Sequence, residues 1–592
     1  MRYESLTGKQ SNLRFISFLS NIYRRAAWLP LLVICVAGLT CEAQDYSSQT
    51  GSPTFSVNQP VPYGFVNLAN GNVHVEIPLA SAPQRGKLPF AAKLVYDSRI
   101  WQIVHAGGSL VWKPNNLPFS IAGWRFVTNA TPGTVTFDAT QITRGCNDTD
   151  NPTVVNFVNF VWMSPDGTPR KFPVATAQDP GCPDDVSSAD GFAVDSSGYH
   201  MYVTSYSTVV IYAKDGTQVY PRVEDANGNY FTTDANGNVV DTLGRTVVQQ
   251  STIGNQSFYD VLNSQGTTSR ITVTTKQIPV HTLFQQPGVS EDQETLTVLD
   301  KVSLPSGESY TFGYDEAVIS DPSTGAFQPG YGLLTGVSPG GAYGYKNFID
   351  PFGIVNRWAA STIDSSIDYV ASAGSIGATL TRNGGTQNFE FDLNNGAWLT
   401  TVTTRIGGRQ VQQITNTYDF SQTCPNPFIN VILNPCIGPA YIRLVNSVTS
   451  DDTGSKQTTY GYDDPRFGNI NLIQNWNYFS GTPPTTPDRQ TVITMQPVIG
   501  QDIRDRVKSV VLKDGSGNRI SETDYSYDGP GLTAPPQTIV NHNSSITGTK
   551  SGQSDADQQV GRRNNIFDYN FHLRHVRPDI ECQGPCRKYN DV

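Results

Sequence analysis

The chain has 592 residues, a formal net charge of −10 and a charged fraction of only 16%. This charge balance excludes an electrostatic footprint for nucleic acid across the body of the protein, so we expect no nucleic-acid partner. Tyr, Phe, Gly and Pro are abundant while helix formers such as Lys and Glu are few, which favours an all-β extracellular protein over a helical or disordered chain.

The N-terminus has the pattern of an export signal. Basic residues up to Arg25 precede an apolar run of 14 residues, Ala26–Leu39, whereas a bilayer-spanning helix needs roughly 20. Cys41-Glu42-Ala43 places small side chains where a signal peptidase reads them, which predicts a signal peptide over 1–43. We expect an exported protein, extracellular or in the cell envelope, that meets the membrane only through this segment. An uncleaved anchor and a lipoprotein anchored on Cys41 are the alternatives.

A polar leader, residues 44–60, precedes a predicted N-terminal β domain over 61–205. Val73, Val75 and Ile77 alternate with His74 and Glu76, the period-2 pattern of a half-buried strand. Short strand candidates of this kind follow one another between turn clusters, and we identify no amphipathic helix in the mature sequence. We therefore expect sheets built from hairpins, arranged as a β-sandwich-like domain.

The word Asp-Ala-Asn-Gly-Asn occurs twice, beginning at Asp225 and Asp234. An EF-hand calcium loop needs glycine at position 6 and glutamate at position 12, between two helices. Here the glycine stands at position 4 and the flanking residues favour strands, so we predict two hairpin turns, with weak calcium binding as the alternative. The turns place Asn227-Gly228 and Asn236-Gly237 at positions that require positive φ. No cofactor or metal ion is predicted.

Later segments with a strand pattern carry aromatic residues at alternate positions. In the phrase Leu304–Asp315, Tyr310, Phe312 and Tyr314 fall on one face of a strand. We expect such stripes to belong to the core, with a sugar-binding platform as the alternative. The candidates for a sugar platform are Trp358, Trp398 and Trp476.

Several of these segments contain Tyr-Asp, or an aspartate followed by a short gap and then Gly-Asn or Gly-Arg. The words are Tyr314-Asp315, Tyr462-Asp463 with Gly468-Asn469, and Asp241 with Gly244-Arg245. With the segments Val66–Leu79 and Tyr331–Asn347, they make the chain resemble the bacterial Rhs or YD-repeat family in patches over residues 60–541. The resemblance implies that residues 206–540 form a degenerate repeat region, a curled array of twisted β-hairpins that winds into part of a hollow shell.

The chain departs from the family in two ways. Its Tyr-Asp pairs begin at 314, 418, 462 and 527, whereas family repeats recur roughly every 20 residues. We also find neither the family's C-terminal core motif nor a toxin domain. Asp350-Pro351-Phe352-Gly353 is similar to that core's self-cleaving word, but its mid-chain position favours a turn.

The tail, residues 541–592, is polar and then basic, and we predict that it is disordered. A frame-shifted gene would explain the change in composition. The tail contains four zinc-type side chains, but their spacing and an oxidising compartment argue against a zinc site. These residues are His572, His575, Cys582 and Cys586.

Six of the eight cysteines lie beyond the signal region. In an oxidising compartment, Cys146 can pair with Cys182 and Cys424 with Cys436, since each pair brackets a Pro-rich loop. Six cysteines allow many connectivities, so the pairing stays open.

The sequence has no nucleophile elbow, zinc-protease word or phosphate-binding glycine loop, so we do not expect an enzyme. We expect an exported, non-enzymatic β-repeat scaffold or cell-surface interaction protein of the Rhs type. The alternatives are the truncated encapsulating shell of a polymorphic-toxin protein and a carbohydrate-binding surface module. The partner is unknown; a protein or a glycan at the cell surface is expected.

Overall fold

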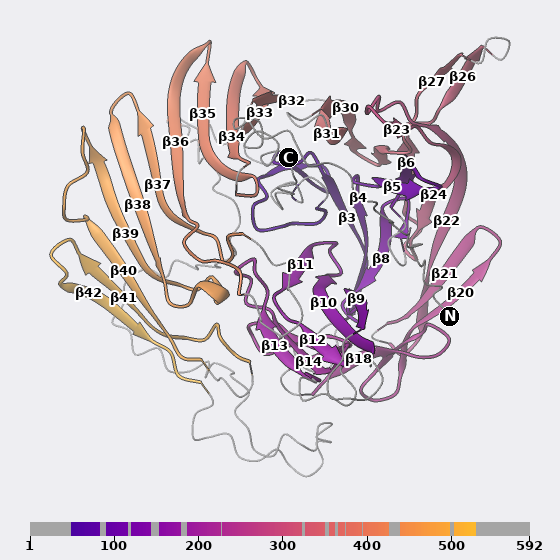
Figure 1. The fold of residues 1–592 in the computed structure, drawn as a ribbon, viewed down its shortest axis with the longest axis horizontal. Coiled ribbons are helices and arrows are strands. Elements are labelled where there is room, and N and C mark those ends of the chain that lie inside the picture. Colours follow the sequence, from indigo (N-terminus) through magenta and orange to yellow (C-terminus); the bar gives the residue numbers. More distant parts are fainter. Residues whose placement is uncertain are drawn as a thin grey trace, which may run out of the picture. The chain divides into compact units, whose positions relative to one another are not determined.

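Figure 1 shows the fold in a computed structural model. The chain divides into two compact units, Met1–Glu42 and Ala43–Val592, and every described residue belongs to the second. The predicted signal peptide and the tail 541–592 therefore lie outside the described residues. The structure describes Tyr46 and residues 49–82, 90–115, 120–143, 153–178, 186–225, 228–263, 265–321, 326–349, 355–361, 365–372, 375–393, 395–425, 438–497 and 502–527.

The described residues form 42 β-strands and no α-helix, which confirms the predicted all-β class. The strands are rich in Val, Thr, Ile and Tyr, whose branched or flat side chains suit a pleated surface. Short turns join most of them into antiparallel hairpins. Within the described part of the chain, no helix has the length and apolarity needed to cross a membrane.

The first sheet has six strands. Val73, Val75 and Ile77 are fully buried on one of its faces, as their alternation predicts. His74 is buried as well, so the half-buried interpretation is wrong at this residue, because Asp97 lies against it on the other face. In spatial order the strands are β1 (Asn58–Val61), β2 (Gly64–Asn67), β3 (Val73–Ala82), β4 (Phe90–Asp97), β8 (Trp124–Thr128) and β7 (Ser120–Ile121).

Two smaller sheets accompany it. In one, β10 is the central strand, and its Phe160 and Trp162 pack against Met201 and Ile211 in a second apolar cluster. In the other, a two-residue strand from much later in the chain pairs in parallel with β6. The strands are β9 (Thr134–Thr143), β10 (Thr153–Met163), β11 (Pro169–Phe172) and β12 (Thr176–Gln178), then β5 (Trp101–Ala106), β6 (Ser109–Pro114) and β23 (Val289–Ser290).

A 14-stranded antiparallel sheet follows, in which spatial order keeps to chain order. The predicted boundary between residues 205 and 206 falls between two paired strands of this sheet, β14 and β15. The strands are β13 (Ala189–Phe192), β14 (His200–Ser205), β15 (Thr208–Tyr212), β16 (Gln218–Tyr220), β17 (Val223–Glu224), β18 (Tyr230–Thr233), β19 (Val239–Asp241), β20 (Thr246–Ile253), β21 (Gln256–Leu262), β22 (Thr268–His281), β24 (Gln293–Ser303), β25 (Ser309–Tyr314), β28 (Leu334–Ser338) and β29 (Gly341–Ala342).

The second long sheet has 11 strands, again in chain order. They are β32 (Ser365–Ser372), β33 (Ser375–Arg382), β34 (Gly385–Asp392), β35 (Trp398–Ile406), β36 (Arg409–Asp419), β37 (Arg443–Asp451), β38 (Gly454–Tyr462), β39 (Ile470–Phe479), β40 (Arg489–Met495), β41 (Val507–Asp514) and β42 (Arg519–Asp524). Two hairpins form separate two-stranded sheets: β26 (Val318–Asp321) with β27 (Ala326–Gln328), and β30 (Gly344–Ile349) with β31 (Val355–Ser361).

The largest core cluster draws residues from the first sheet, from the 14-stranded sheet and from the first strands of the 11-stranded sheet. It begins at Tyr46 and continues along the chain to Val402. Polar contacts support it, since the Trp124 indole N–H donates to the Tyr314 hydroxyl at 3.0 Å. One apolar cluster therefore joins residues of the predicted N-terminal domain to residues of the predicted repeat region.

Candidate functional site

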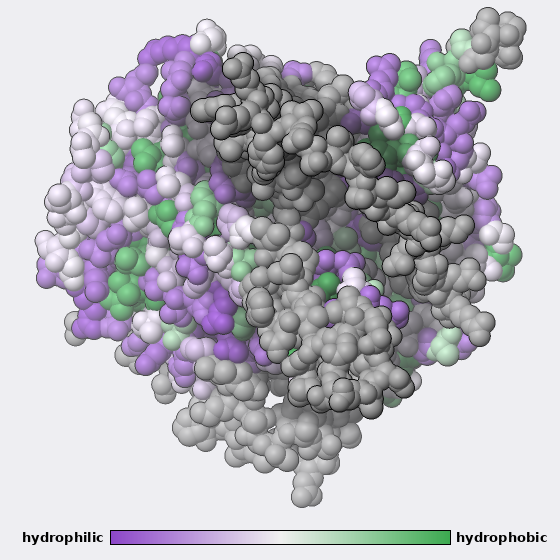
Figure 2. Space-filling model, in the orientation of Figure 1, coloured by the Kyte–Doolittle hydropathy of each residue, from purple (hydrophilic) through white to green (hydrophobic). Residues whose placement is uncertain are grey.

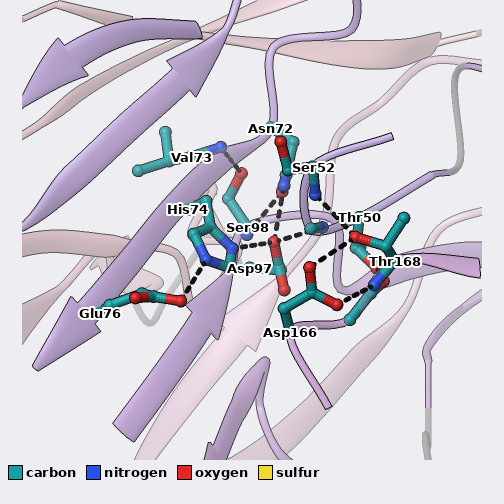
Figure 3. A network of polar contacts seen from close by, with 12 residues as sticks. Thr50, Ser52, Asn72, Val73, His74, Glu76, Asp97, Ser98, Asp166 and Thr168 are labelled. Atoms are coloured by element: carbon teal, nitrogen blue, oxygen red, sulfur yellow. Dashed lines mark hydrogen bonds and ion pairs between the residues drawn. The ribbon is translucent and has the colours of Figure 1, made fainter. Parts of the chain in front are cut away.

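A buried polar network surrounds Asp97, the last residue of β4 (Figure 3). His74 of β3 lies directly opposite it in the sheet, with its Nδ1 2.9 Å from the Asp97 carboxylate. The Asn72 amide donates to the same oxygen at 2.6 Å, and the Gly51 backbone N–H donates at 3.0 Å. Arg125 of β8 pairs with the other carboxylate oxygen. Asp97 thus holds three strands and the segment before them together.

The other side of the His74 ring is also occupied. Its Nε2 lies 3.3 Å from the Glu76 carboxylate, which in turn pairs with Lys93. The ring stacks on Phe65, the residue paired with it in the β2–β3 hairpin, at a centroid distance of 4.8 Å. Each polar atom and one face of the imidazole therefore has a fixed neighbour.

The charges in this network stabilise one another. Burial alone would lower the pKa of His74, but the charge and hydrogen bond of Asp97, with those of Glu76, raise it to about 9. Burial alone would raise the pKa of Asp97, but His74 and Arg125 hold it well below its usual range. The hydrogen bond from His74 and the charge of Lys93 lower the pKa of Glu76 to about 2, against the effect of its burial. At neutral pH the His74 ring is therefore a cation, held between the carboxylates of Asp97 and Glu76.

The network also fastens two remote segments to the first sheet. The Thr50 hydroxyl donates to the Gly167 carbonyl at 2.5 Å, and the Ser52 N–H donates to the Thr168 hydroxyl at 2.9 Å. Thr168 in turn donates to Asp166 at 2.9 Å (Figure 3). Residues 50–52 and the turn between β10 and β11 are thereby held beside Asp97.

A second histidine has a similar surrounding. His200 of β14 lies with Nδ1 2.7 Å from the Asp502 carboxylate and with Nε2 2.9 Å from the Asp190 carboxylate. The Tyr202 hydroxyl donates to Asp502 at 3.0 Å, and Arg504 pairs with it at 3.3 Å. Burial alone would raise the pKa of Asp502, but His200, Tyr202 and Arg504 lower it.

The two groups share one geometry. His74 pairs across a hairpin with Phe65, and His200 pairs across a hairpin with Phe192; each ring stacks on its phenylalanine. In both groups, Nδ1 faces an aspartate that also binds an arginine, and Nε2 faces a second carboxylate. Because each ring nitrogen lies against its own carboxylate, neither histidine presents a free nitrogen for general-base chemistry. We name these groups the His74 clasp and the His200 clasp.

The Asp-Ala-Asn-Gly-Asn words form turns. The Asp234 N–H donates to the Asn238 carbonyl, and the Asp234 carboxylate accepts from the Asn236 and Asn238 N–H groups at 2.8 and 2.9 Å. Gly237 has φ of 83°, whereas Asn236 is not among the positive-φ residues, so this is a three-residue loop with a single left-handed glycine. In the first word, Gly228 has φ of 77°, and Asn227 lies outside the described residues.

The turn at Asp241 follows the same scheme. Its N–H donates to the Arg245 carbonyl, Gly244 has φ of 74°, and Arg245 pairs with the Asp241 carboxylate at 2.6 Å. The carboxylates of Asp234 and Asp241 therefore bind their own turns. Among the described residues, no three His, Cys, Asp or Glu side chains converge on a position suited to a metal ion.

The Tyr-Asp words occupy equivalent places at strand ends. A shift of register, the mark of a β-bulge, immediately precedes Tyr314, Tyr418 and Tyr462 in their strands. The Tyr462 hydroxyl donates to the Leu444 carbonyl of the preceding strand at 2.7 Å, and the Tyr527 hydroxyl does the same to Val507 at 2.8 Å. Tyr462 and Tyr527 thus fasten the ends of neighbouring strands.

The residues after these tyrosines have separate roles. The half-buried Asp315 carboxylate accepts the N–H groups of Tyr331 and Leu333. The Asp463 N–H donates to the Asn469 carbonyl at 3.1 Å. Gly468 ends a short 3₁₀ turn with φ of 62°, and the Asn469 amide donates to the Arg504 carbonyl at 2.8 Å, next to the His200 clasp.

Of the predicted disulfide residues, only Cys424 is described; Cys146, Cys182 and Cys436 lie outside the described residues. The Cys424 N–H donates to the Gly438 carbonyl at 3.0 Å, which brings the flanks of the second proposed bridge together. The aromatic stripe is core as predicted, since Phe312 and Tyr314 are buried. Trp398 packs on Tyr418 at 5.1 Å, and the Trp476 indole donates to Pro484.

Sequence reasoning missed both clasps. The one local signal is a histidine inside an apolar strand, as in Val73-His74-Val75 and the run around His200. A buried histidine implies a partner, but the pattern does not name it. No protein-family model matches the chain, and no curated protein matches it.

Proposed function

We propose that the chain is an exported β-repeat scaffold of the Rhs type that acts as an interaction protein at the cell surface. The observation that carries the proposal is the recurrence of the Tyr-Asp words after a bulge at the ends of strands. In Tyr462 and Tyr527, the hydroxyl reaches the carbonyl of the preceding strand. Each contact closes the open end of one hairpin, β37–β38 and β41–β42, and the return of one contact in separate hairpins is what an array of similar repeat units would show.

The sheets themselves support a scaffold role. From β32 to β42 each strand pairs with its neighbours in the chain, without a crossover. Stacked repeats of this kind present broad surfaces to a partner, because each unit adds one more row of side chains to the same face. The predicted signal over 1–43 places that surface outside the cytoplasm. The proposed disulfides, Cys146–Cys182 and Cys424–Cys436, would staple loops there.

Two measurements test the proposal. The full chain is expressed in a bacterial host with its own N-terminus, and mass spectrometry of the cell fractions locates the product. We expect a chain that begins at Gln44 in the envelope or the medium; an unprocessed chain in the cytoplasm would refute export. The purified, labelled chain is then added to intact cells, where saturable binding is expected. Binding that rises linearly with concentration would refute the interaction role.

A further inference from the structure

Five asparagines in the chain are followed directly by glycine: Asn70, Asn227, Asn236, Asn383 and Asn395. In such a pair the peptide nitrogen of the glycine can attack the side-chain amide of the asparagine, because a residue without Cβ leaves this nitrogen open to approach. The fold decides whether the two groups are free to meet. Of the five asparagines, Asn227 lies outside the described part of the chain.

The pair Asn383-Gly384 forms the turn between β33 and β34 (Figure 1). Its φ angles are 49° and 76°, which is the two-residue type I′ turn of a β-hairpin. Both residues are exposed, and a Cβ added to Gly384 would meet no atom within 4 Å. Neither the Asn383 amide nor the Gly384 N–H has a hydrogen-bond partner among the described residues. The two groups that must react are therefore both free.

The first pair in the chain is held on both sides. Asn70 is fully buried, and its amide donates to the Tyr46 and Gln49 carbonyls at 2.9 and 2.8 Å. The Gly71 N–H donates to the Asn67 carbonyl at 2.7 Å. Both the nitrogen that would attack and the amide that would be attacked are therefore fixed.

Two further pairs are each held at one group. The Gly237 N–H donates to the Asp234 carbonyl at 3.0 Å, so the nitrogen that would attack Asn236 is engaged. The Asn395 amide donates to the Asp392 carboxylate at 2.8 Å, so the group that would leave is engaged. Each of these contacts must break before a ring can close, whereas the β33–β34 turn has no such contact.

We propose that Asn383 is a site of spontaneous deamidation, the one that the fold leaves open among the described Asn-Gly pairs. The Gly384 nitrogen loses its proton to solvent base and forms a bond to Cγ of Asn383. The bond from Cγ to the amide nitrogen breaks, and that nitrogen takes up a proton and leaves as ammonia. Water then opens the cyclic imide at either carbonyl, which gives aspartate or isoaspartate. The reaction consumes water and needs no cofactor.

The product changes the hairpin in two ways. It places a negative charge next to the exposed Arg382, and isoaspartate adds a carbon to the main chain, which a two-residue turn does not fit. Leu380 and Phe389 of the same hairpin are buried in the largest core cluster. We therefore expect the change to stay at the turn while the core holds the rest of the hairpin.

Mass spectrometry of the folded full chain tests the site. The chain is kept in mildly alkaline buffer, samples are digested over time, and fragment spectra assign each asparagine that has become an acid. We expect Asn383 to react about fivefold faster than Asn236, the factor that corresponds to about 1 kcal/mol for one broken hydrogen bond. Equal rates, or a faster reaction at Asn236 or Asn395, would overturn the proposal.

The same measurement in urea separates the effect of the fold from that of the sequence. In the unfolded chain the hydrogen bonds are absent, so the reactions at Asn70, Asn236 and Asn395 should approach the rate at Asn383. A preference for Asn383 that persists unchanged in urea would show that the fold does not select it.

The variant Asn383→Gln is the matched control for the assignment. Its longer side chain would have to close a larger ring, so the product at the turn should disappear while Asn236 reacts as before. Reaction at the turn of this variant at the wild-type rate would also overturn the proposal.

Discussion

The Nδ1 atom of His200 lies 2.7 Å from the carboxylate of Asp502, which is 302 positions further along the chain. Two backbone hydrogen bonds of 2.7 Å lie in the same region, from Arg504 to Lys214 and from Tyr441 to Val194. The segments that join β36 to β37 and β40 to β41 in the 11-stranded sheet are therefore hydrogen-bonded to the first strands of the 14-stranded sheet and the segments between them. The His200 clasp is a junction between the two long sheets.

The substitution Asp502→Asn should loosen this junction without unfolding either sheet. It leaves the size of the side chain but removes the charge that faces His200 and Arg504, which weakens both contacts. We expect amide hydrogen exchange to speed up by about tenfold or more at residues 190–203 and 502–506, because local opening becomes easier.

A control lies at the opposite end of the 11-stranded sheet. Asp452 is exposed and pairs with the exposed Arg409, so Asp452→Asn should leave exchange at residues 190–203 unchanged. Equal exchange in Asp502→Asn and wild type would show that the clasp does not hold the junction.

Replacing Asp97 should be among the costliest single changes in the chain. In Asp97→Asn, the largely buried Arg125 loses its charged partner, and His74 loses the closer of its two carboxylates. Breaking a buried charge pair costs about 3–5 kcal/mol. Denaturant titration of the free energy of unfolding should show that loss. The exposed pair of Asp260 and Arg270 provides the comparison, since Asp260→Asn should cost at most about 1 kcal/mol.

His74 should make stability fall at alkaline pH. Its pKa is about 9 in the folded chain and 6.5 in the unfolded chain, so folding favours the protonated ring. The contribution is complete below pH 6.5 and is lost as the pH rises through about 9. A difference of this size corresponds to about 3 kcal/mol.

The variant His74→Asn isolates this effect. The difference in free energy of unfolding between wild type and variant should shrink as the pH rises from 6.5 to 10. A constant difference over that range would mean that the pKa of His74 is the same in the folded and the unfolded chain.

Asp315 should act at the acidic end. Burial raises its pKa to about 6, although the N–H groups of Tyr331 and Leu333 oppose the rise. The folded chain therefore favours the protonated carboxyl. Its contribution to stability is complete below about pH 4 and is lost as the pH rises through 6, a change of roughly 2–3 kcal/mol. Wild type should gain stability relative to Asp315→Asn between pH 7 and pH 5; an unchanged gap would contradict this.

Alanine substitutions at two glycines should distinguish the cost of a left-handed backbone from the cost of steric crowding by the added Cβ. Gly244 has φ of 74° with no atom near the position of an added Cβ, so Gly244→Ala should cost about 1 kcal/mol for the left-handed backbone alone. Gly123 has φ of 86°, and an added Cβ would collide with the Asp97 carbonyl and lie 2.8 Å from Ile100. Gly123→Ala should cost at least about 2 kcal/mol more by thermal or denaturant unfolding. Similar costs for the two would contradict the role of crowding.

Much of the fold could be predicted from the sequence because strands and turns depend on neighbouring residues. The alternation of Val73, Val75 and Ile77 located a strand and its buried face, and the position of Gly237 in its word located a turn. The type of turn could not be predicted from the sequence. Asn236 and Gly237 both suit positive φ, and the hydrogen bonds of the Asp234 carboxylate selected a loop in which only the glycine adopts it.

The partners of the buried charges were decided only by the tertiary structure. His74 and His200 are buried histidines with mainly apolar neighbours in their strands. This pattern indicates that a counter-charge is needed but not where it lies in the chain. Asp97 lies against His74 because the register of β3 and β4 pairs these two residues. Asp502 lies against His200 because the two long sheets come together in space, although these residues are far apart in the chain. The exposure of the β26–β27 hairpin, along which Figure 2 shows hydrophobic residues, has the same origin. Val318 and Ile319 look like core residues in the sequence, and they stay exposed because no further strand pairs with β26 and β27.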